Sequence, residues 1–415
     1  MLRLCARRAL CTASIVASLP IAIGWSTSAH AQEVELSRKR VAELARVAPA
    51  ARVAEAEAAI TGAAVTAAGT FSLENPLISG LGGVRFNPDG SRPFSGVATL
   101  SWPVDLGGKR SARVDSAKAD HGAAKISAER ERREVLLAAL LQHALVLRAQ
   151  QQVTLAKARH DLAARVYSAA EKRRAVGSVP ELDVALAAMQ EKRDAAALAS
   201  SIGDHKAERL TLLTLLGVAG TPPVSGDLVP SGDVPSLAVL VRQVEGRVDV
   251  RAAAAASAAA RARAERERSS RWPTVNLLAQ YERDDRANIG LLGLAVPLPI
   301  LNANRAQVAT SAAEVSAANA RLALARGASA GKAKELSTRY TTTQAAMDAL
   351  VPVVATAHRA VTLATRGYEL GESDLSSVLL VRRELVESEA ALLEARHTHA
   401  AVKIEVLVTA GRIPE

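Results

Sequence analysis

The sequence matches itself when it is shifted by 194 residues. Alanine matches alone would carry little weight in so alanine-rich a chain, whereas Pro and Gly mark places where the backbone must turn. These breaking residues align under the shift without a gap: Pro103 with Pro297, Gly177 with Gly371, and Gly217 with Gly411. The chain is therefore predicted to be one structural unit used twice, which restricts the possible folds to those that pack two equivalent copies.

Each copy has the same predicted order of elements. Residues 32–217 form the first copy and residues 235–415 the second, joined by a Pro- and Gly-rich linker at 218–234. In each copy an alanine-rich helix, at about 36–69 and 235–270, precedes a β-hairpin, at about 70–106 and 274–300. In the second hairpin Leu277 and Tyr281 alternate with Gln280, which is typical of a strand. A hairpin that packs on a soluble core is the alternative.

A long helix is predicted after each hairpin. Heptad-like apolar residues recur between charges from about 109 to 176 and again from about 305 to 368, where only Pro352 should introduce a kink. At 1.5 Å per residue, roughly 65 residues make a rod of about 100 Å. Helices of this length pack as coiled coils. The fold class is therefore mainly α with a small β part.

The long helices end at two similar breaks, "AVGSVPELDVAL" and "GYELGESDLSSVLL", which predict helix tips at 175–183 and 367–376. Gly177 and Gly371 can adopt a positive φ where the chain reverses. Asp183 and Asp374 would then favour the positive N-terminus of each returning helix. A simple connector between two helices is the alternative interpretation of these breaks.

The N-terminus predicts export. Residues 1–31 combine arginines, a short apolar stretch and an A-x-A site at Ala29 and Ala31, the pattern of a cleavable signal peptide. Cys5 and Cys11 lie inside this segment and not in a lipobox, so we expect no lipid anchor and no cysteine in the mature chain. The formal charge is +10, but the arginines are scattered beside acids along helices, which argues against a nucleic-acid partner.

The Phe and Trp residues of the mature chain lie in or beside the hairpins. Two levels of aromatics that bracket short apolar strands are typical of a membrane β-barrel, although strands favour aromatic residues in general. The predicted membrane-interface residues are Phe86, Phe94, Trp102 and Trp272.

Four strands cannot close a barrel, because their free edges would leave backbone groups unpaired in lipid. Three copies would supply twelve strands, an even antiparallel number wide enough for a passage. We therefore predict a homotrimer whose strands together form a 12-stranded transmembrane β-barrel, with the long helices below it.

Three segments resemble the TolC-type outer-membrane efflux factors, and the resemblance covers nearly all of the mature chain. The segments are "VEGRVDVRAAAAASAAARARAERERSSRWPTVNL", "LAVPLPILNANRAQV" and "YELGESDLSSVLLVRRELVESEAALLEAR". The second segment, with Pro297, Pro299 and Asn302, is most similar to the heavy-metal (cobalt-zinc-cadmium type) efflux subgroup.

The resemblance implies a β-barrel in the outer membrane, in contact with its lipid, and an α-helical tunnel through the periplasm. It also implies that the tips dock to a periplasmic adaptor (membrane fusion) protein, itself bound to an RND-type inner-membrane pump. The channel would passively conduct divalent heavy-metal cations. A multidrug or other small-molecule efflux channel of the same fold is the alternative, followed by a periplasmic adaptor or a structural coiled-coil protein.

The resemblance also identifies Tyr368 as the gate tyrosine, held by a hydrogen bond in the closed state. The expected tip and gate residues are Gly177, Asp183, Tyr368, Gly371, Glu372 and Asp374. The sequence departs from the family where acidic gate residues and an arginine are expected, because those positions hold Ser377, Leu380 and Ser373.

We find no catalytic constellation in the sequence, and we expect neither an enzyme nor a cofactor. No nucleophile motif and no Gly-rich phosphate loop after a strand are present. The eight histidines form no metal array, since even His397 and His399 point to different sides of a helix. We therefore predict no metal site.

Overall fold

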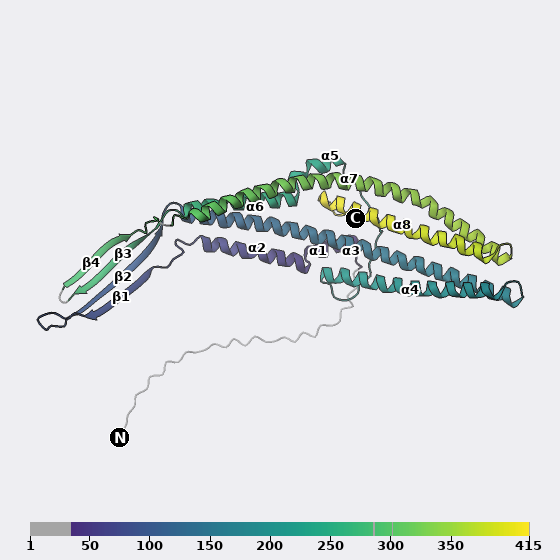
Figure 1. The fold of residues 1–415 in the computed structure, drawn as a ribbon, viewed down its shortest axis with the longest axis horizontal. Helices are drawn as coiled ribbons and strands as arrows, with labels where there is room; N and C mark the ends of the chain where they lie inside the picture. Colours follow the sequence, from purple (N-terminus) through teal and green to yellow (C-terminus); the bar gives the residue numbers. More distant parts are fainter. Residues whose placement is uncertain (1–34, 285–286, 301, 415) are drawn as a thin grey trace, which may run out of the picture. The chain divides into compact units, whose positions relative to one another are not determined.

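The computed structural model describes residues 35–284, 287–300 and 302–414. The expected signal peptide at 1–31, with both cysteines, lies outside these residues. Figure 1 shows the elements in chain order. They are α1 (Arg38–Arg46), α2 (Pro49–Ala68), β1 (Leu77–Val84), β2 (Phe94–Asp105), α3 (Lys109–Ala175), α4 (Glu181–Leu216), α5 (Leu237–Arg242), the short 3-10 helix η1 (Val244–Gly246), α6 (Val248–Ser269), β3 (Thr274–Asp284), β4 (Ala287–Ala295), α7 (Arg305–Leu370) and α8 (Leu375–Thr409).

The two hairpins form one antiparallel sheet in the order β1-β2-β3-β4. Strand β2 of the first copy pairs with β3 of the second, with Ala98 opposite Tyr281 and Trp102 opposite Leu277. The outer edges of β1 and β4 pair with no other strand among the described residues. The predicted class, mainly α with four strands per chain, is confirmed.

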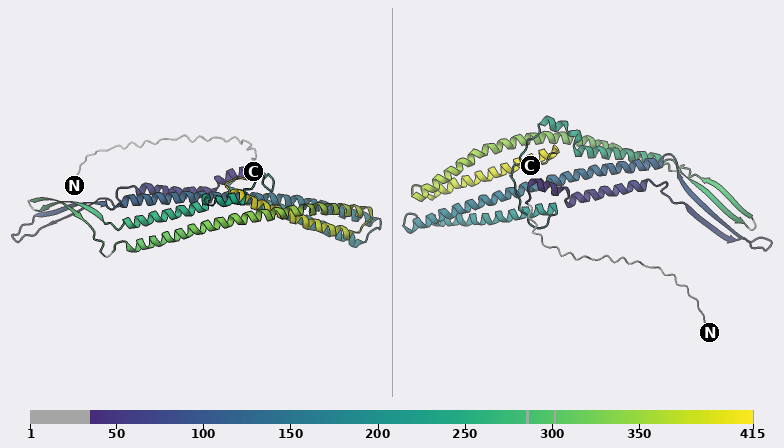
Figure 2. Two further views of the ribbon diagram at one scale, coloured as in Figure 1. Left: turned by 90° about the horizontal axis from the view of Figure 1, so that it is seen from above. Right: turned by 180° about the vertical axis from the view of Figure 1, so that it is seen from behind.

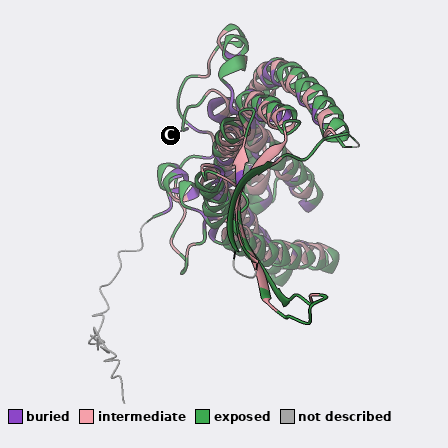
Figure 3. Cartoon of the chain, turned by 90° about the vertical axis from the view of Figure 1, so that its left-hand side faces the viewer, coloured by how far each residue is buried: buried purple, intermediate pink, exposed green. Residues whose placement is uncertain are grey.

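The two central strands have chemically different faces, because residues paired across a sheet share a side. One face of β2 and β3 is apolar, and Figure 3 shows how much of the sheet is exposed. This face presents Ala98, Leu100, Trp102, Val104, Val275, Leu277, Ala279 and Tyr281. The opposite face carries the polar side chains Ser95, Thr99, Ser101, Asn276, Gln280 and Glu282.

The long helices pack as two antiparallel pairs, α3 with α4 and α7 with α8 (Figures 1 and 2). Helix α3 joins the two copies, because it also packs against α6 and α8 of the second copy. The shorter helices α2 and α6 pack beside the part of α3 that follows the hairpin, and α6 packs on α7.

The shift of 194 residues seen in the sequence is retained in three dimensions. Helix α4 begins at Glu181 and α8 begins at Leu375, which are related by that shift. The glycines that close the equivalent helices also match, with φ of 76° at Gly177 and 85° at Gly371. Equivalent residues of the two copies can therefore be compared directly in space.

The first helix of each copy is shorter than the sequence suggested. The helix expected at 36–69 is broken between Arg46 and Pro49, since proline lacks the N–H that a continuing helix needs and is favoured in the first turn. The helix expected at 235–270 is divided into α5, η1 and α6. There the extended Arg247 precedes α6, and its buried guanidinium donates to the Ser329 carbonyl at 2.8 Å.

A buried histidine fixes the start of the described chain to the linker. His143 on α3 is fully buried, and its Nε2 lies 3.1 Å from the Leu36 carbonyl oxygen and 3.2 Å from that of Ser225. Only a protonated Nε2 can bind two carbonyls, so Nδ1 is the unprotonated nitrogen, and it has no partner among the described residues. Burial lowers the pKa of His143 to about 4.

We expect the folded chain to lose stability as the pH falls from about 6.5 toward 4. The unfolded chain binds a proton at His143 below its ordinary pKa, while the folded chain does not until the pH approaches 4. The resulting loss in the free energy of unfolding amounts to about 2–3 kcal/mol by pH 4.5. Urea unfolding at pH 7 and 4.5 measures it, and His143→Gln should reduce the difference. An equal pH dependence in both proteins would contradict the assignment.

Candidate functional site

The two tip turns have the backbone geometry that glycine favours. Gly177 and Gly371 both have a positive φ, and none of the described residues would come closer than ordinary van der Waals contact to a Cβ at either position. The residue after each glycine returns its N–H to the helix it has just left. Ser178 donates to the Arg173 carbonyl at 2.8 Å, and Glu372 donates to the Gly367 carbonyl at 2.8 Å. Each turn therefore supplies hydrogen-bond donors to carbonyl groups that would otherwise be unpaired at the end of a helix.

Asp374 occupies the position before α8, but its carboxylate does not cap the helix backbone. It instead accepts hydrogen bonds from the hydroxyls of Ser376 and Ser377. The Ser376 bond is the largest of the effects that lower the pKa of Asp374, so the exposed carboxylate stays charged. Ser377, where the resemblance led us to expect an acid, thus supports a neighbouring acid. Glu372 is exposed, and Asp183 lies in the first turn of α4.

Tyr368 contacts α3 through its ring and its backbone. The side chain is 1% exposed and packs with Val166, Ala170, Leu375 and Val378. The Arg173 guanidinium lies 4.7 Å from the ring centroid and donates to the Tyr368 carbonyl at 2.8 Å. The hydrogen bond expected at the gate is not made within the chain, because no described residue partners the hydroxyl.

A buried charge network joins the helix pairs farther from the tips. Arg382 of α8 is 4% exposed and donates both to Asp194 of α4 and, at 2.7 Å, to the Arg159 carbonyl of α3. Arg159 in turn forms an ion pair with Glu389 of α8 at 3.1 Å. His358 of α7 lies 3.2 Å from Glu389. All four long helices therefore meet in one network of side chains.

The sequence did not identify Arg159, Arg173, Arg382 or their acidic partners. Each arginine stands among other charges on an alanine-rich helix, so its spacing resembles that of a solvated face. The available signal was the repeat itself, because Arg382 aligns with Ala188 and Arg173 with Gly367. A charge that is present in only one copy can mark a contact that only one copy makes.

The four predicted interface aromatics are exposed at the two ends of the strands. Phe94 begins β2 opposite Val84, and Phe86 lies just beyond β1, where the Arg92 guanidinium is 5.2 Å from its ring centroid. Trp102 and Trp272 lie at the other end, near the helices. Trp272 also packs over Gly107, where a Cβ would come within 2.3 Å of the indole.

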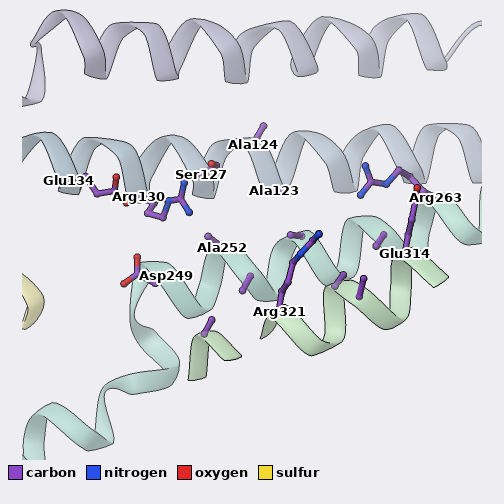
Figure 4. Close-up of a pocket in the computed structure, with 16 residues that line it drawn as sticks. Ala123, Ala124, Ser127, Arg130, Glu134, Asp249, Ala252, Arg263, Glu314 and Arg321 are labelled. Atoms are coloured by element: carbon purple, nitrogen blue, oxygen red, sulfur yellow. Dashed lines mark ion pairs between the residues drawn. The ribbon is translucent and has the colours of Figure 1, made fainter. Parts of the chain in front are cut away.

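Alanines line a groove between α3, α6 and α7, with a volume of about 960 Å³ (Figure 4). Charges of both signs stand along it, and Figure 4 shows that they come from all three helices. They are Arg130, Glu134, Asp249, Arg263, Glu314 and Arg321. The described residues contain no group of three or more His, Cys, Asp or Glu side chains able to hold a metal ion.

Among the described residues, no helix is long and apolar enough to cross a membrane.

The chain matches known proteins over most of its length. The sequence model of the family described as outer membrane efflux protein matches residues 34–218 and 239–405. The cobalt-zinc-cadmium resistance protein CzcC of Cupriavidus metallidurans is 28% identical over 304 residues, which cover 70% of this chain and 71% of CzcC.

Solved structures share the fold at lower identity. The outer-membrane channel OprN has a TM-score of 0.75 at 19% identity, with 90% of this chain and 89% of OprN covered. The outer membrane protein VceC of Vibrio cholerae has a TM-score of 0.72 at 19% identity, covering 90% and 96%. CusC, described as forming a transmembrane channel, has a TM-score of 0.69 at 18% identity, covering 91% and 93%.

We expect Arg382→Met to destabilise the chain by about 3–5 kcal/mol, because Asp194 would lose its cationic partner in a partly buried position. The neighbouring Arg383 provides a matched control, since its side chain is 75% exposed and pairs with Glu387 on the same helix. Arg383→Met should change stability by no more than about 0.5 kcal/mol. Urea unfolding of the purified variants measures both, and equal losses would show that the network adds nothing to stability.

Proposed function

Because the chain belongs to the outer membrane efflux protein family, we propose that it is the outer-membrane channel of a tripartite efflux system that exports divalent heavy-metal cations. The observation that carries the choice of cargo is the similarity to the cobalt-zinc-cadmium resistance protein over 70% of the chain. The metal is cargo that passes through the channel, so the protein needs no resident metal site. Residues 1–31 would be removed on export.

The free edges of the sheet support a trimer. Among the described residues, the outer edges of β1 and β4 pair with no strand, and lipid cannot satisfy the backbone groups of such an edge. Edge-to-edge association of three copies pairs every strand and gives twelve strands, a barrel that leaves a passage. The apolar face with Trp102 and Leu277 would then meet lipid, and the face with Thr99 and Gln280 would line the passage. The exposed aromatics would lie at the two membrane interfaces.

The tips would form the periplasmic mouth and the surface that an adaptor protein grips, with an RND-type pump behind the adaptor. Both turns end a long helix at the same place in each copy, so three chains present six similar turns at one level. The residues proposed for this role are Gly177, Asp183, Tyr368, Gly371, Glu372 and Asp374. Their exposed carboxylates, Glu372 and Asp374, offer charges to a partner, while Tyr368 holds the helices together.

Conduction would be passive. The proposed tube is lined by solvated polar side chains and catalyses no chemical step. It only provides a path along which a hydrated ion would have nearly the same free energy as in water. The pump would supply the driving force and select the cargo. The chain's own residues would keep the tube closed at the tips until the adaptor binds, which requires contacts between helices strong enough to hold them and weak enough to release.

We expect Leu277→Arg to reduce the amount of assembled protein in the outer membrane. A charge on the apolar face costs roughly 2–4 kcal/mol at the middle of the bilayer. Gln280→Arg on the same strand is the matched control, because Gln280 belongs to the polar face. Membrane fractionation and heat-modifiable migration in gels measure assembly. Equal assembly of both variants would place the lipid-facing side elsewhere.

Deletion of the gene in its host should lower tolerance to zinc, cobalt or cadmium and leave tolerance to hydrophobic drugs unchanged. Loss of this exit would raise the periplasmic metal concentration, so growth inhibition should begin at a lower external metal concentration. Growth curves and cellular metal content measure this, with the wild-type gene restored as the control. A loss of drug tolerance without a loss of metal tolerance would replace the proposed cargo by small organic molecules.

A further inference from the structure

A polar pocket lies where the sheet meets the long helices (Figure 1). It has a volume of about 380 Å³, and its walls come from the turn between α6 and β3, the start of α3 and the loop between β4 and α7. Three residues of the sequence segment "LAVPLPILNANRAQV" line it, namely Pro297, Pro299 and Asn302. This segment therefore builds a cavity as well as connecting a strand to a helix. We call the cavity the junction pocket.

Two cations of the junction pocket have no acidic partner. Arg271 follows α6 and is exposed, and its side chain forms no ion pair or hydrogen bond among the described residues. Lys109 is half-buried, and its ammonium donates to the neutral hydroxyl of Thr274 at 2.9 Å. An ammonium has three N–H donors, so Lys109 can hold an anion and keep this hydrogen bond.

The acids nearest to the junction pocket are already paired. Glu267, which lines the pocket, accepts hydrogen bonds from Arg266 at 2.9 Å and from the Asn304 amide at 3.1 Å. Asp105 forms an ion pair with Arg113 at 3.1 Å. Because each acid has its own cation, the two remaining cations give the junction pocket a net positive charge.

Exposed apolar side chains lie beside these cations. Leu298 and Ile300 of the loop leave 74% and 79% of their surface open, and Trp272 leaves 61% open. Leu298 and Trp272 also line the junction pocket. Water solvates such apolar surface poorly, whereas the boundary of a membrane accommodates both kinds of group, because acyl chains meet the apolar side chains and headgroups meet the charges.

We propose that the junction pocket binds the phosphate headgroup of an anionic membrane phospholipid. The inference rests on the proposed channel, in which the sheet lies in lipid and the helices lie outside it, so the pocket stands at the level of the headgroups. Lys109 and Arg271 bind the phosphate, while Leu298 and Trp272 contact the first carbons of the acyl chains. A free phosphate ion would leave these apolar side chains in water, which is why a lipid is the favoured occupant.

The charge of the pocket also selects among phospholipids. Phosphatidylglycerol carries one net negative charge and no cation, so both Lys109 and Arg271 attract its headgroup. Phosphatidylethanolamine has an ammonium of its own, which the two cations repel. We therefore expect phosphatidylglycerol to bind more tightly than phosphatidylethanolamine with the same acyl chains.

Native mass spectrometry of the delipidated protein in detergent tests the pocket by counting bound lipids. Added phosphatidylglycerol should bind at one site per chain, and Arg271→Gln should weaken its affinity about fivefold, the contribution of one cation near a lipid surface. Arg268→Gln is the matched control, because Arg268 is exposed, pairs with Glu265 and does not line the pocket. It should change the affinity less than about twofold. Equal losses in both variants would overturn the pocket in favour of general surface charge.

Three further probes identify the chemistry that is bound. Millimolar inorganic phosphate should not displace phosphatidylglycerol, and diacylglycerol with the same acyl chains should not bind. Leu298→Ser, a change at an exposed position, should weaken the binding of phosphatidylglycerol. Displacement by phosphate together with an unchanged affinity in Leu298→Ser would make this a site for free anions. Equal binding of diacylglycerol would show that the phosphate is not recognised, and either result would overturn the proposal.

Failure of this inference differs from failure of the proposed function. A protein that fractionates with the outer membrane as a trimer, but binds phosphatidylglycerol no better than its Arg271→Gln variant, would overturn the lipid site and leave the channel standing. A protein that does not reach the outer membrane would overturn both, because the pocket would meet no headgroups.

Discussion

The pairing of β2 with β3 is the constraint on which the rest of the structure depends. It joins a strand of the first copy to a strand of the second, so two hairpins that would each be marginal become one sheet. The helices that follow are then held at the same level. Lys109 and Asp105 of the first copy reinforce the junction, because Lys109 donates to the Thr274 hydroxyl of β3 at 2.9 Å and that hydroxyl donates to Asp105 at 3.2 Å. The sheet therefore sets the register that the two long helix pairs keep down to their tips.

Much of this fold could be predicted because its signals are local or repeated. A glycine such as Gly371 permits a turn through its own backbone freedom, whatever residues lie around it. The alternation around Leu277 likewise identifies a strand and its apolar side without knowledge of the neighbouring strand. The break before Pro49 was missed, since a proline in the first turn of a second helix resembles any proline near an alanine-rich helix. Arg382 was missed for a different reason. Its partners Asp194 and Arg159 are about 190 and 220 residues away, and no local pattern brings distant residues together.

The tip site also combines features that the local sequence predicts with contacts that depend on distant residues. The tip positions were found from glycine and from a resemblance, yet the contact that holds Tyr368 comes from Arg173 on the other copy. The sequence already departs from the family's acidic gate residues, and in the structure Ser377 at one of those positions donates to Asp374. Which residues make the contacts around Tyr368 therefore could not be taken from the motif alone.

Duplication alone would make the two copies of the chain alike in their packing. The charges break this symmetry. Arg148 and Arg159 of the first copy correspond to Thr342 and Val353 of the second, and Arg382 of the second copy corresponds to Ala188 of the first. Separating Arg382 from Asp194 would leave charges unpaired in a partly buried place, which is costly, whereas the equivalent places of the other copy hold no ion pair. The two copies therefore share a fold but differ in the contacts that hold their helices.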